Sequence, residues 1–311
     1  MSRTMGIFIG VLSLLSTVAI AEQISAKGEP IALTMRGDYY MGPKWSPDGE
    51  QIAAAGASYT GLYLFDFPTG SMKVLSNAYS AGYEFSWSHD GSHIAAKISQ
   101  FNNMRRSHTL VTINVADGSQ EDITTPRSTM SGRPRWSADD SYLYLTFAER
   151  FESFRLNEVS RSIPDQDHLY VKEGRFQVRS NSVDNLRFED QERLYSYAIS
   201  PDGSRIAYST SGQELWIADI SGENRMSLGR GMSPSWSPDG TWISCMFNED
   251  DGHSITSSDI YLVKADGTIR TNLTNSTDKI EMNPQWSPDG DWIVYDTDRL
   301  GQIFIQQVEW R

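Results

Sequence analysis

The chain has 311 residues, of which 40 are acidic and 27 are lysine or arginine, giving a net charge of −13. A chain this acidic repels nucleic acid and anionic lipid surfaces, which argues against both as partners. Its single cysteine, Cys245, excludes an internal disulfide, and its place in an apolar run predicts a buried, unreactive thiol.

The N-terminus has the pattern of an export signal. Arg3 precedes an apolar stretch, Ile7–Ile20, which ends in a small-x-small sequence. This stretch is short for a membrane span, and no later segment is apolar enough to be one, so residues 1–21 are predicted to be a cleaved signal peptide. Residues 22–311 are then predicted to form a single domain, periplasmic or secreted, with no integral membrane segment.

One seven-residue pattern recurs six times along the rest of the chain, at intervals of 37 to 63 residues. Its copies are Pro43-Lys-Trp-Ser-Pro-Asp-Gly49, Phe85-Ser-Trp-Ser-His-Asp-Gly91, Pro134-Arg-Trp-Ser-Ala-Asp-Asp140, Tyr197-Ala-Ile-Ser-Pro-Asp-Gly203, Pro234-Ser-Trp-Ser-Pro-Asp-Gly240 and Pro284-Gln-Trp-Ser-Pro-Asp-Gly290. Proline, aspartate and glycine in this order favour a tight turn between two strands. Repeats of this length are typical of propeller blades or of a solenoid.

Each copy is followed by more strand-like sequence. An apolar run comes directly after the turn, as in Ile243–Phe247, and most copies then show two alternating segments separated by a second turn. Four strands per repeat make a blade, which predicts an all-β, six-bladed β-propeller of four-stranded blades. The tryptophans of the pattern are expected to pack between blades, and its aspartates to serve the turns.

The two ends of the repeat array are complementary. The sixth copy stops after its third strand, near Ile303–Val308, whereas Ile31–Thr34 precedes the first copy in the way that Asn272–Thr274 precedes the sixth. We therefore expect residues 31–34 to join the last blade and close the ring, which leaves no exposed sheet edge. A solenoid would not need this pairing.

The pattern resembles the WD-like repeats of the C-terminal propeller of the TolB family. The resemblance extends over nearly all of residues 22–311 and is closest in residues 234–305, which include Tyr295-Asp-Thr-Asp-Arg-Leu-Gly-Gln-Ile-Phe. TolB has a further α/β domain before its propeller, and only residues 22–42 precede the first copy here. The resemblance implies a Tol-system-like binding or scaffold protein, whose channel mouth receives a protein or peptide partner in the cell envelope.

Residues just ahead of each copy are expected to line that mouth. Tyrosine supplies contact area and a hydrogen bond at low entropic cost, which suits a binding surface. The predicted binding residues are Asp38, Tyr39, Tyr40, Tyr83, Glu84, Arg133, Tyr195, Tyr197, Met232, Glu281 and Asn283. The long third interval, residues 148–192, is expected to contribute the remaining strands of its copy together with either a partner-binding flap or a meandering loop.

No cofactor and no catalytic residue is predicted. The acidic loop Asn248–His253 has only part of the ligand set of a Ca²⁺ loop, and the chain has no hydrolase nucleophile motif. Two alternatives to a binding protein stay open. One is an enzyme of the uronate polysaccharide lyase type, acting on an oligosaccharide, which would require His108, His168 and His253 to meet in space. The other is a purely structural envelope protein.

Overall fold

The computed structural model describes residues 24–102, 105–130, 132–147, 150–156, 168–172, 175–179, 194–298 and 301–310. The predicted signal peptide lies outside these residues. The described chain is built from antiparallel β-sheets, with one short 3₁₀ turn at Ala57–Tyr59, and it contains no helix long and apolar enough to cross a membrane. The expected all-β, propeller-like class is confirmed.

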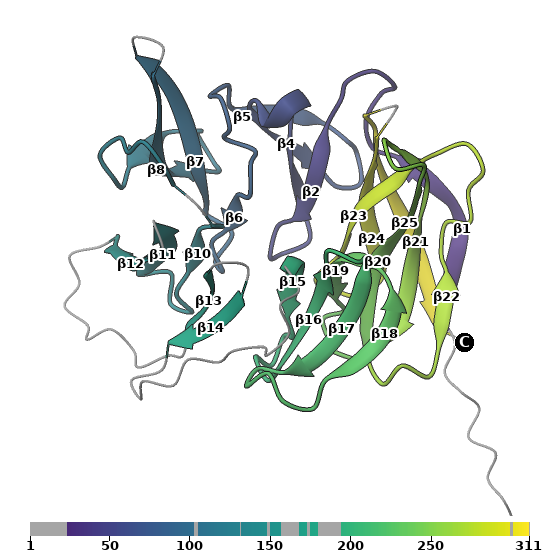
Figure 1. Ribbon diagram of the computed structural model, residues 1–311. Helices are drawn as coiled ribbons and strands as arrows, with labels where there is room; N and C mark the ends of the chain where they lie inside the picture. Colours follow the sequence, from purple (N-terminus) through teal and green to yellow (C-terminus); the bar gives the residue numbers. More distant parts are fainter. Residues whose placement is uncertain are drawn as a thin grey trace, which may run out of the picture.

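Four copies of the pattern each open a four-stranded sheet whose strand order follows the chain. These sheets contain β2 (Met41–Trp45), β3 (Gln51–Ala55), β4 (Leu62–Asp66) and β5 (Met72–Ser76); β6 (Ser86–Trp87), β7 (His93–Asn102), β8 (Arg105–Asn114) and β9 (Gln120–Asp122); β15 (Leu194–Ile199), β16 (Arg205–Thr210), β17 (Glu214–Asp219) and β18 (Met226–Arg230); and β19 (Met232–Trp236), β20 (Trp242–Asp250), β21 (Ile255–Lys264) and β22 (Arg270–Asn272). Figure 1 shows the sheets following one another around the molecule in chain order.

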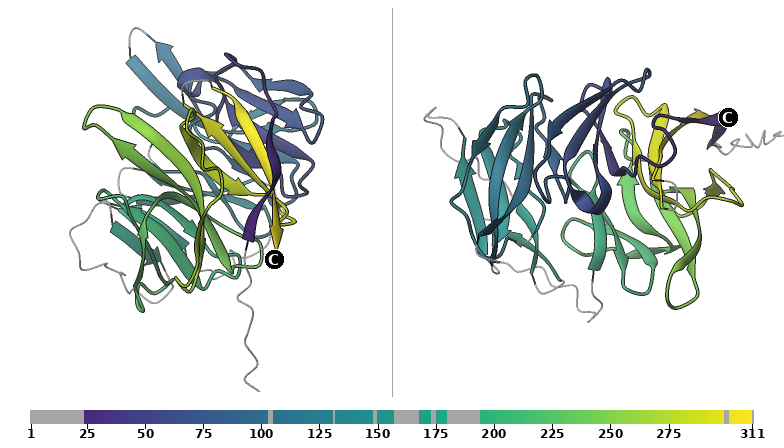
Figure 2. Two further views of the ribbon diagram at one scale, coloured as in Figure 1. Left: turned by 90° about the vertical axis from the view of Figure 1, so that its right-hand side faces the viewer. Right: turned by 90° about the horizontal axis from the view of Figure 1, so that it is seen from above.

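The sixth copy completes its sheet with a strand from the other end of the chain. Its own strands are β23 (Glu281–Trp286), β24 (Trp292–Thr297) and β25 (Ile303–Trp310), and β1 (Ile24–Ala32) pairs antiparallel with β25. Ile31 lies opposite Ile305, as the sequence predicted, but the paired strand begins at Ile24, seven residues earlier than expected. Figures 1 and 2 show β1 beside β25, at the edge of the last sheet.

The third copy differs from the predicted four-stranded blade. Its sheet holds three strands among the described residues, namely β10 (Arg135–Trp136), β11 (Tyr142–Phe147) and β12 (Arg150–Arg155). Two further strands, β13 (His168–Lys172) and β14 (Arg175–Arg179), pair with each other as a separate hairpin instead of extending that sheet. The rest of the long third interval lies outside the described residues.

The repeated turn is stabilised by the same serine–aspartate unit in all six copies. In the first copy, Ser46 Oγ donates to Asp48 Oδ1 (2.5 Å) and accepts from the backbone N–H of Gln51 (2.9 Å). The corresponding serine–aspartate pairs are Ser88–Asp90, Ser137–Asp139, Ser200–Asp202, Ser237–Asp239 and Ser287–Asp289. These aspartates therefore serve the turns, as the sequence predicted.

Tryptophans of the pattern tie neighbouring sheets together. The indole Nε1 of Trp87 donates to Lys44 O of the preceding copy, at 3.3 Å. Trp136 bonds to Ser86 O and Trp236 to Ala198 O in the same way. The sixth copy is linked to the first because Gln285 Oε1 accepts the backbone N–H of Trp45 (2.8 Å).

The second strand of each copy is the most deeply buried. Ile52–Ala55 in β3 are at most 1% exposed, and Trp242–Cys245 in β20 are fully buried. Burial of this kind on both faces is typical of a strand packed between two neighbouring sheets. Cys245 is buried, as predicted, and burial raises the pKa of its thiol to about 12, which disfavours the reactive thiolate.

Candidate binding site

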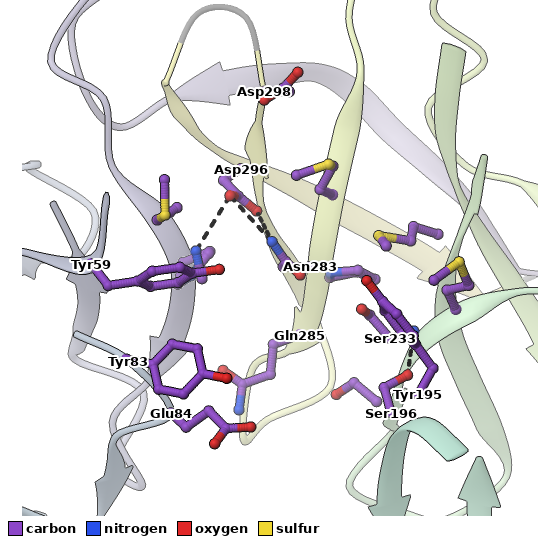
Figure 3. A pocket seen from close by; sticks show the side chains of 18 of the residues that line it. Tyr59, Tyr83, Glu84, Tyr195, Ser196, Ser233, Asn283, Gln285, Asp296 and Asp298 are labelled. Atoms are coloured by element: carbon purple, nitrogen blue, oxygen red, sulfur yellow. Dashed lines mark hydrogen bonds between the residues drawn. The ribbon is translucent and has the colours of Figure 1, made fainter. Parts of the chain in front are cut away.

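A cavity of about 1510 Å³ lies where the six copies converge. Its lining comes from the residues just ahead of each pattern and from the loops that connect the second and third strands. Nine of the eleven predicted binding residues line it: Tyr39, Tyr40, Tyr83, Glu84, Arg133, Tyr195, Tyr197, Met232 and Asn283. Figure 3 shows part of this wall from close by.

Two of the predicted residues are not part of the lining. Asp38 is exposed, and its carboxylate accepts the backbone N–H of Met35 at 3.2 Å, so it serves a local turn. Glu281 is the first residue of β23 and is 1% exposed, because strand alternation turns its side chain into the protein. Burial raises the pKa of Glu281.

Backbone bulges explain why side chains at the mouth face the cavity. The residue just before the pattern has a positive φ in four copies: Gly42 (60°), Glu84 (55°), Ser233 (50°) and Asn283 (52°). At three of these places the strand register also shifts, between Met41 and Lys44, Met232 and Ser235, and Met282 and Gln285. A bulge interrupts the strict alternation of a strand and re-aims one side chain. The same local device therefore changes which residues face the cavity in these copies.

Four exposed tyrosines lie in the lining of the site. Tyr39, Tyr83 and Tyr195 are 49%, 44% and 68% exposed. Tyr59, in the loop after β3, is 42% exposed and packs edge-to-face on Tyr83, with ring centroids 5.1 Å apart. In Figure 3, Tyr59 and Tyr83 extend from one side of the cavity and Tyr195 from the opposite side.

Asp296 is a buried carboxyl group in the cavity wall. It lies on β24, is 1% exposed, and accepts hydrogen bonds from Gly42 N (3.3 Å) and from Asn283 Nδ2 (2.9 Å to Oδ1 and 3.3 Å to Oδ2). Burial raises the pKa of Asp296 to about 7, although these hydrogen bonds oppose the shift; Asp298 raises it further. The carboxyl group thereby connects the bulges of the sixth and first copies.

Two lysines lie at the opposite wall: Lys44 is half-buried and lines the cavity, and Lys97 is buried. Lys44 Nζ donates to Phe85 O and lies 4.5 Å from the centre of the Phe85 ring. Lys97, 3% exposed, donates to Gly132 O and lies 3.5 Å from Glu84 Oε2. Burial lowers the pKa of both lysines, and the charge of Glu84 partly offsets this.

The sequence analysis missed Tyr59 and Asp296, which both line the cavity. Tyr59 follows the second strand of the first copy, and Asp296 lies near the end of the second strand of the sixth copy, whereas the predictions took only residues ahead of each pattern. The two kinds of position lie at the same end of the sheets, because a strand hairpin reverses the chain. The alternating strand directions of a four-stranded blade could therefore have been used to predict that Tyr59 and Asp296 lie at the same mouth.

Among the described residues, the histidines do not gather at the cavity. Among the described lining residues, His253 is the sole histidine, and the described residues contain no group of three His, Cys, Asp or Glu arranged to hold a metal. In the acidic loop, Asp250 accepts Gly252 N, and Asp251 accepts the N–H groups of His253 and Ser254. Neither a Ca²⁺ ion in this loop nor the alternative of a histidine-based lyase site, which the sequence left open, has a supporting contact among the described residues.

Comparison with known proteins places the chain among propellers. Residues 182–310 match the model of the TolB beta propeller domain. The structure of putative TolB from Agrobacterium tumefaciens superposes with a TM-score of 0.56 and 17% identity, over 90% of this chain and 92% of that one. The chain carries a TolB-like β-propeller.

Other propellers share the fold of this TolB-like protein at low identity. The β-propeller domain of Cps50 (Swd1) from Myceliophteria thermophila gives a TM-score of 0.61 at 10% identity, over 90% of this chain and 99% of that one. A chain of the Mitotic Checkpoint Complex gives 0.61 at 14% identity, over 98% of both chains. No curated protein sequence matches. At such identities these likenesses concern the fold alone.

Proposed function

We propose that this TolB-like propeller is a non-catalytic binding protein that receives a segment of a partner protein at the mouth of its cavity. The observation that carries the proposal is the convergence of four exposed tyrosines, Tyr39, Tyr59, Tyr83 and Tyr195, on one cavity to which all six copies contribute. Tyrosines in such positions provide rigid contact area with a polar end, which is characteristic of protein-binding surfaces. The cavity is also larger than most small-molecule pockets.

We infer that the surrounding architecture is a closed ring of six blades, made by residues 22–311 as one domain. Three observations support this proposal: the serine–aspartate turn occurs six times, β1 pairs with β25, and contacts join successive copies. The third and fourth copies are joined by Arg135, whose guanidinium group lies 5.2 Å from the centre of the Tyr197 ring. A closed ring would hold the mouth residues in fixed positions around the cavity.

We also propose that the protein works in the periplasm or outside the cell, with a Tol-system-like partner in the cell envelope. The signal-like sequence before residue 22 and the TolB-like propeller support this location. Fractionation of cells expressing the tagged full chain tests it. Mature protein that begins near residue 22 in the periplasmic fraction is the expected result, and uncleaved protein in the cytoplasm would contradict it.

The binding function is tested by capture from an envelope extract. Immobilised wild-type protein is compared with a Tyr83→Ala/Tyr195→Ala variant and with Tyr79→Ala, which removes an exposed tyrosine (60%) that does not line the cavity. The mouth variant is expected to lose at least tenfold in captured partner, because truncated aromatic hot spots cost about 2 kcal/mol or more. Equal capture by all three proteins would refute the proposal.

A further inference from the structure

Most charged groups of the cavity wall are separated by sign; the exception is Glu84, an acidic residue in the part of the lining that is otherwise basic. The acidic part comes from the fifth and sixth copies, with Asp250, Asp296 and Asp298 in the lining. The lining that these two copies contribute within the described residues contains no lysine or arginine. Asp250 and Asp298 are exposed, so a ligand can reach their carboxylates.

The opposite part of the wall, from the first three copies, is basic. Lys44, Arg133 and Arg135 line it, and Lys97 lies beneath Glu84. Lys44 Nζ already donates a hydrogen bond to Phe85 O, and the guanidinium group of Arg135 lies over the ring of Tyr197. Arg133 is exposed and makes no ion pair within the described part of the chain. It is therefore the cation in this part of the wall that is available to a ligand.

The groups between the two charged parts are aromatic. Tyr59 and Tyr83 stand near Glu84 at the basic side, and Tyr195 faces them (Figure 3). Burial and then the charge of Asp296 raise the pKa of Tyr59, whereas Glu84 raises the pKa of Tyr83 and Arg133 opposes that increase, so charged groups of both parts act on the aromatic surface. Flat aromatic side chains of this kind suit the backbone and the uncharged side chains of an extended segment.

We propose that the cavity mouth selects a peptide segment that carries one basic and one acidic side chain, with the basic side chain toward Asp298 and Asp250 and the acidic one toward Arg133. This inference rests on the proposed binding function and adds the charge order of the segment. Complementary charges in a partly enclosed cavity set the orientation and the rate of association more than the affinity. A segment with charges of one sign meets repulsion on one side of the mouth.

Four acetylated and amidated probe peptides test the charge order, with calorimetric titration of the full-length protein at low ionic strength. They are Arg-Gly-Phe-Gly-Asp, Arg-Gly-Phe-Gly-Arg, Asp-Gly-Phe-Gly-Asp and the neutral Gln-Gly-Phe-Gly-Asn. The first is expected to bind about two- to fivefold more tightly than the neutral peptide for each ion pair that it forms. Its advantage is expected to shrink in high salt. A single-sign or neutral peptide that binds as tightly as the first would overturn the proposal.

Charge reversal at each side provides the second arm. Arg133→Glu is expected to shift the preference to the basic peptide, and Asp298→Lys to the acidic peptide. Arg105→Glu and Glu121→Lys are matched controls, because both residues are exposed and neither lines the cavity, so neither should change the preference. Unchanged preferences in the two mouth variants would contradict the proposed charge order.

The outcomes separate this inference from the function on which it rests. If all four peptides bind equally and Tyr83→Ala/Tyr195→Ala weakens all of them, the mouth binds peptides and the charge order is wrong. If none binds to the wild-type protein at millimolar concentration, the peptide-binding function itself is contradicted.

Discussion

At the scale of single residues, Asp296 shows two opposing effects on one carboxyl group. Donors from Gly42 and Asn283 favour its charged form, whereas a 1% exposed position favours the neutral form. Burial prevails, since the pKa lies near 7 rather than near 4. The group can therefore change its charge near neutral pH, at the point where two bulges of the mouth meet.

Asp296 makes the stability of the protein depend on pH. Between about pH 4 and 7 the folded state retains a proton that the unfolded state has released. The stabilising contribution is thus complete below pH 4 and is lost as the pH rises to about 7, by up to roughly 4 kcal/mol. Urea unfolding at pH 4.5, 6 and 8 should show this loss in the wild type and in the exposed control Glu121→Gln, which does not act on Asp296. Asp296→Asn should lack it, and an equal pH dependence in all three proteins would contradict the assignment.

At the scale of elements, the departures of the second and third turns from the pattern complement each other. The second turn has His89 in place of proline, and the third has Asp140 in place of glycine. Asp140 accepts the backbone N–H of His89 (2.9 Å), the His89 ring Nδ1 (2.7 Å) and the N–H of Asp90 (3.0 Å). A proline at position 89 would have no N–H to donate. The two substitutions therefore form one polar contact between neighbouring turns.

This contact predicts a coupled pair of mutations. His89→Pro and Asp140→Gly should each destabilise the protein, because each removes hydrogen bonds between the second and third turns. The double variant restores the pattern of the other copies and should lose less than the sum of the two, with a coupling of about 1 kcal/mol. A double-mutant cycle by thermal or urea unfolding measures it, and additive losses would show that the contact contributes no coupling.

Among the contacts between successive turns of the pattern, the contact between the third and fourth turns is the most weakly packed. Elsewhere a proline lies against the glycine of the next turn, as Pro288 does against Gly49 and Pro238 against Gly290. Ala138 takes the proline position in the third copy, and a Cβ added to Gly203 would meet no atom within 4 Å. Ile199, which has no indole N–H, also replaces the tryptophan of the fourth copy.

Filling this junction should stabilise the protein. Ala138→Pro restores the Ser-Pro-Asp sequence of four other copies, so the backbone there should accept it, and such a change typically adds about 0.4–1 kcal/mol. The melting temperature of Ala138→Pro, compared with that of Ala138→Ser, tests the expectation. A lower melting temperature for the proline variant would show that the third turn differs in backbone conformation.

At the scale of the whole molecule, β1 covers what would otherwise be the open edge of β25. A chain starting at Leu33 should leave the outer edge of β25 unpaired from Phe304 to Trp310, and an unpaired edge promotes association between molecules. We expect such a chain to melt at a lower temperature and to form larger species, as measured by size-exclusion chromatography with light scattering. The chain starting at Glu22 is the control. A monomeric, equally stable truncated chain would mean that β1 is dispensable.

The sequence was informative where a local pattern determines the structure, and less so where distant segments meet. The six turns and the pairing of Ile31 with β25 could be predicted from repeated residues and from a missing strand. Glu281 was misplaced because the bulge at Asn283 changes which side of β23 faces the cavity. Asp296 was missed because its role depends on Gly42, 254 residues away in the chain.

The pairing of β1 with β25 has a consequence for the order of folding. Ser25 and Glu309, which hydrogen-bond across this pair, are 284 residues apart. During synthesis or export the first strand emerges long before its partner exists, so the last sheet forms only after nearly all of the other strands are available. Closing such a distant contact is slow compared with forming the local hairpins. A chain interrupted before β25 would therefore keep its first strand unpaired and accessible to proteases. Incomplete chains should thus be degraded more readily than complete ones.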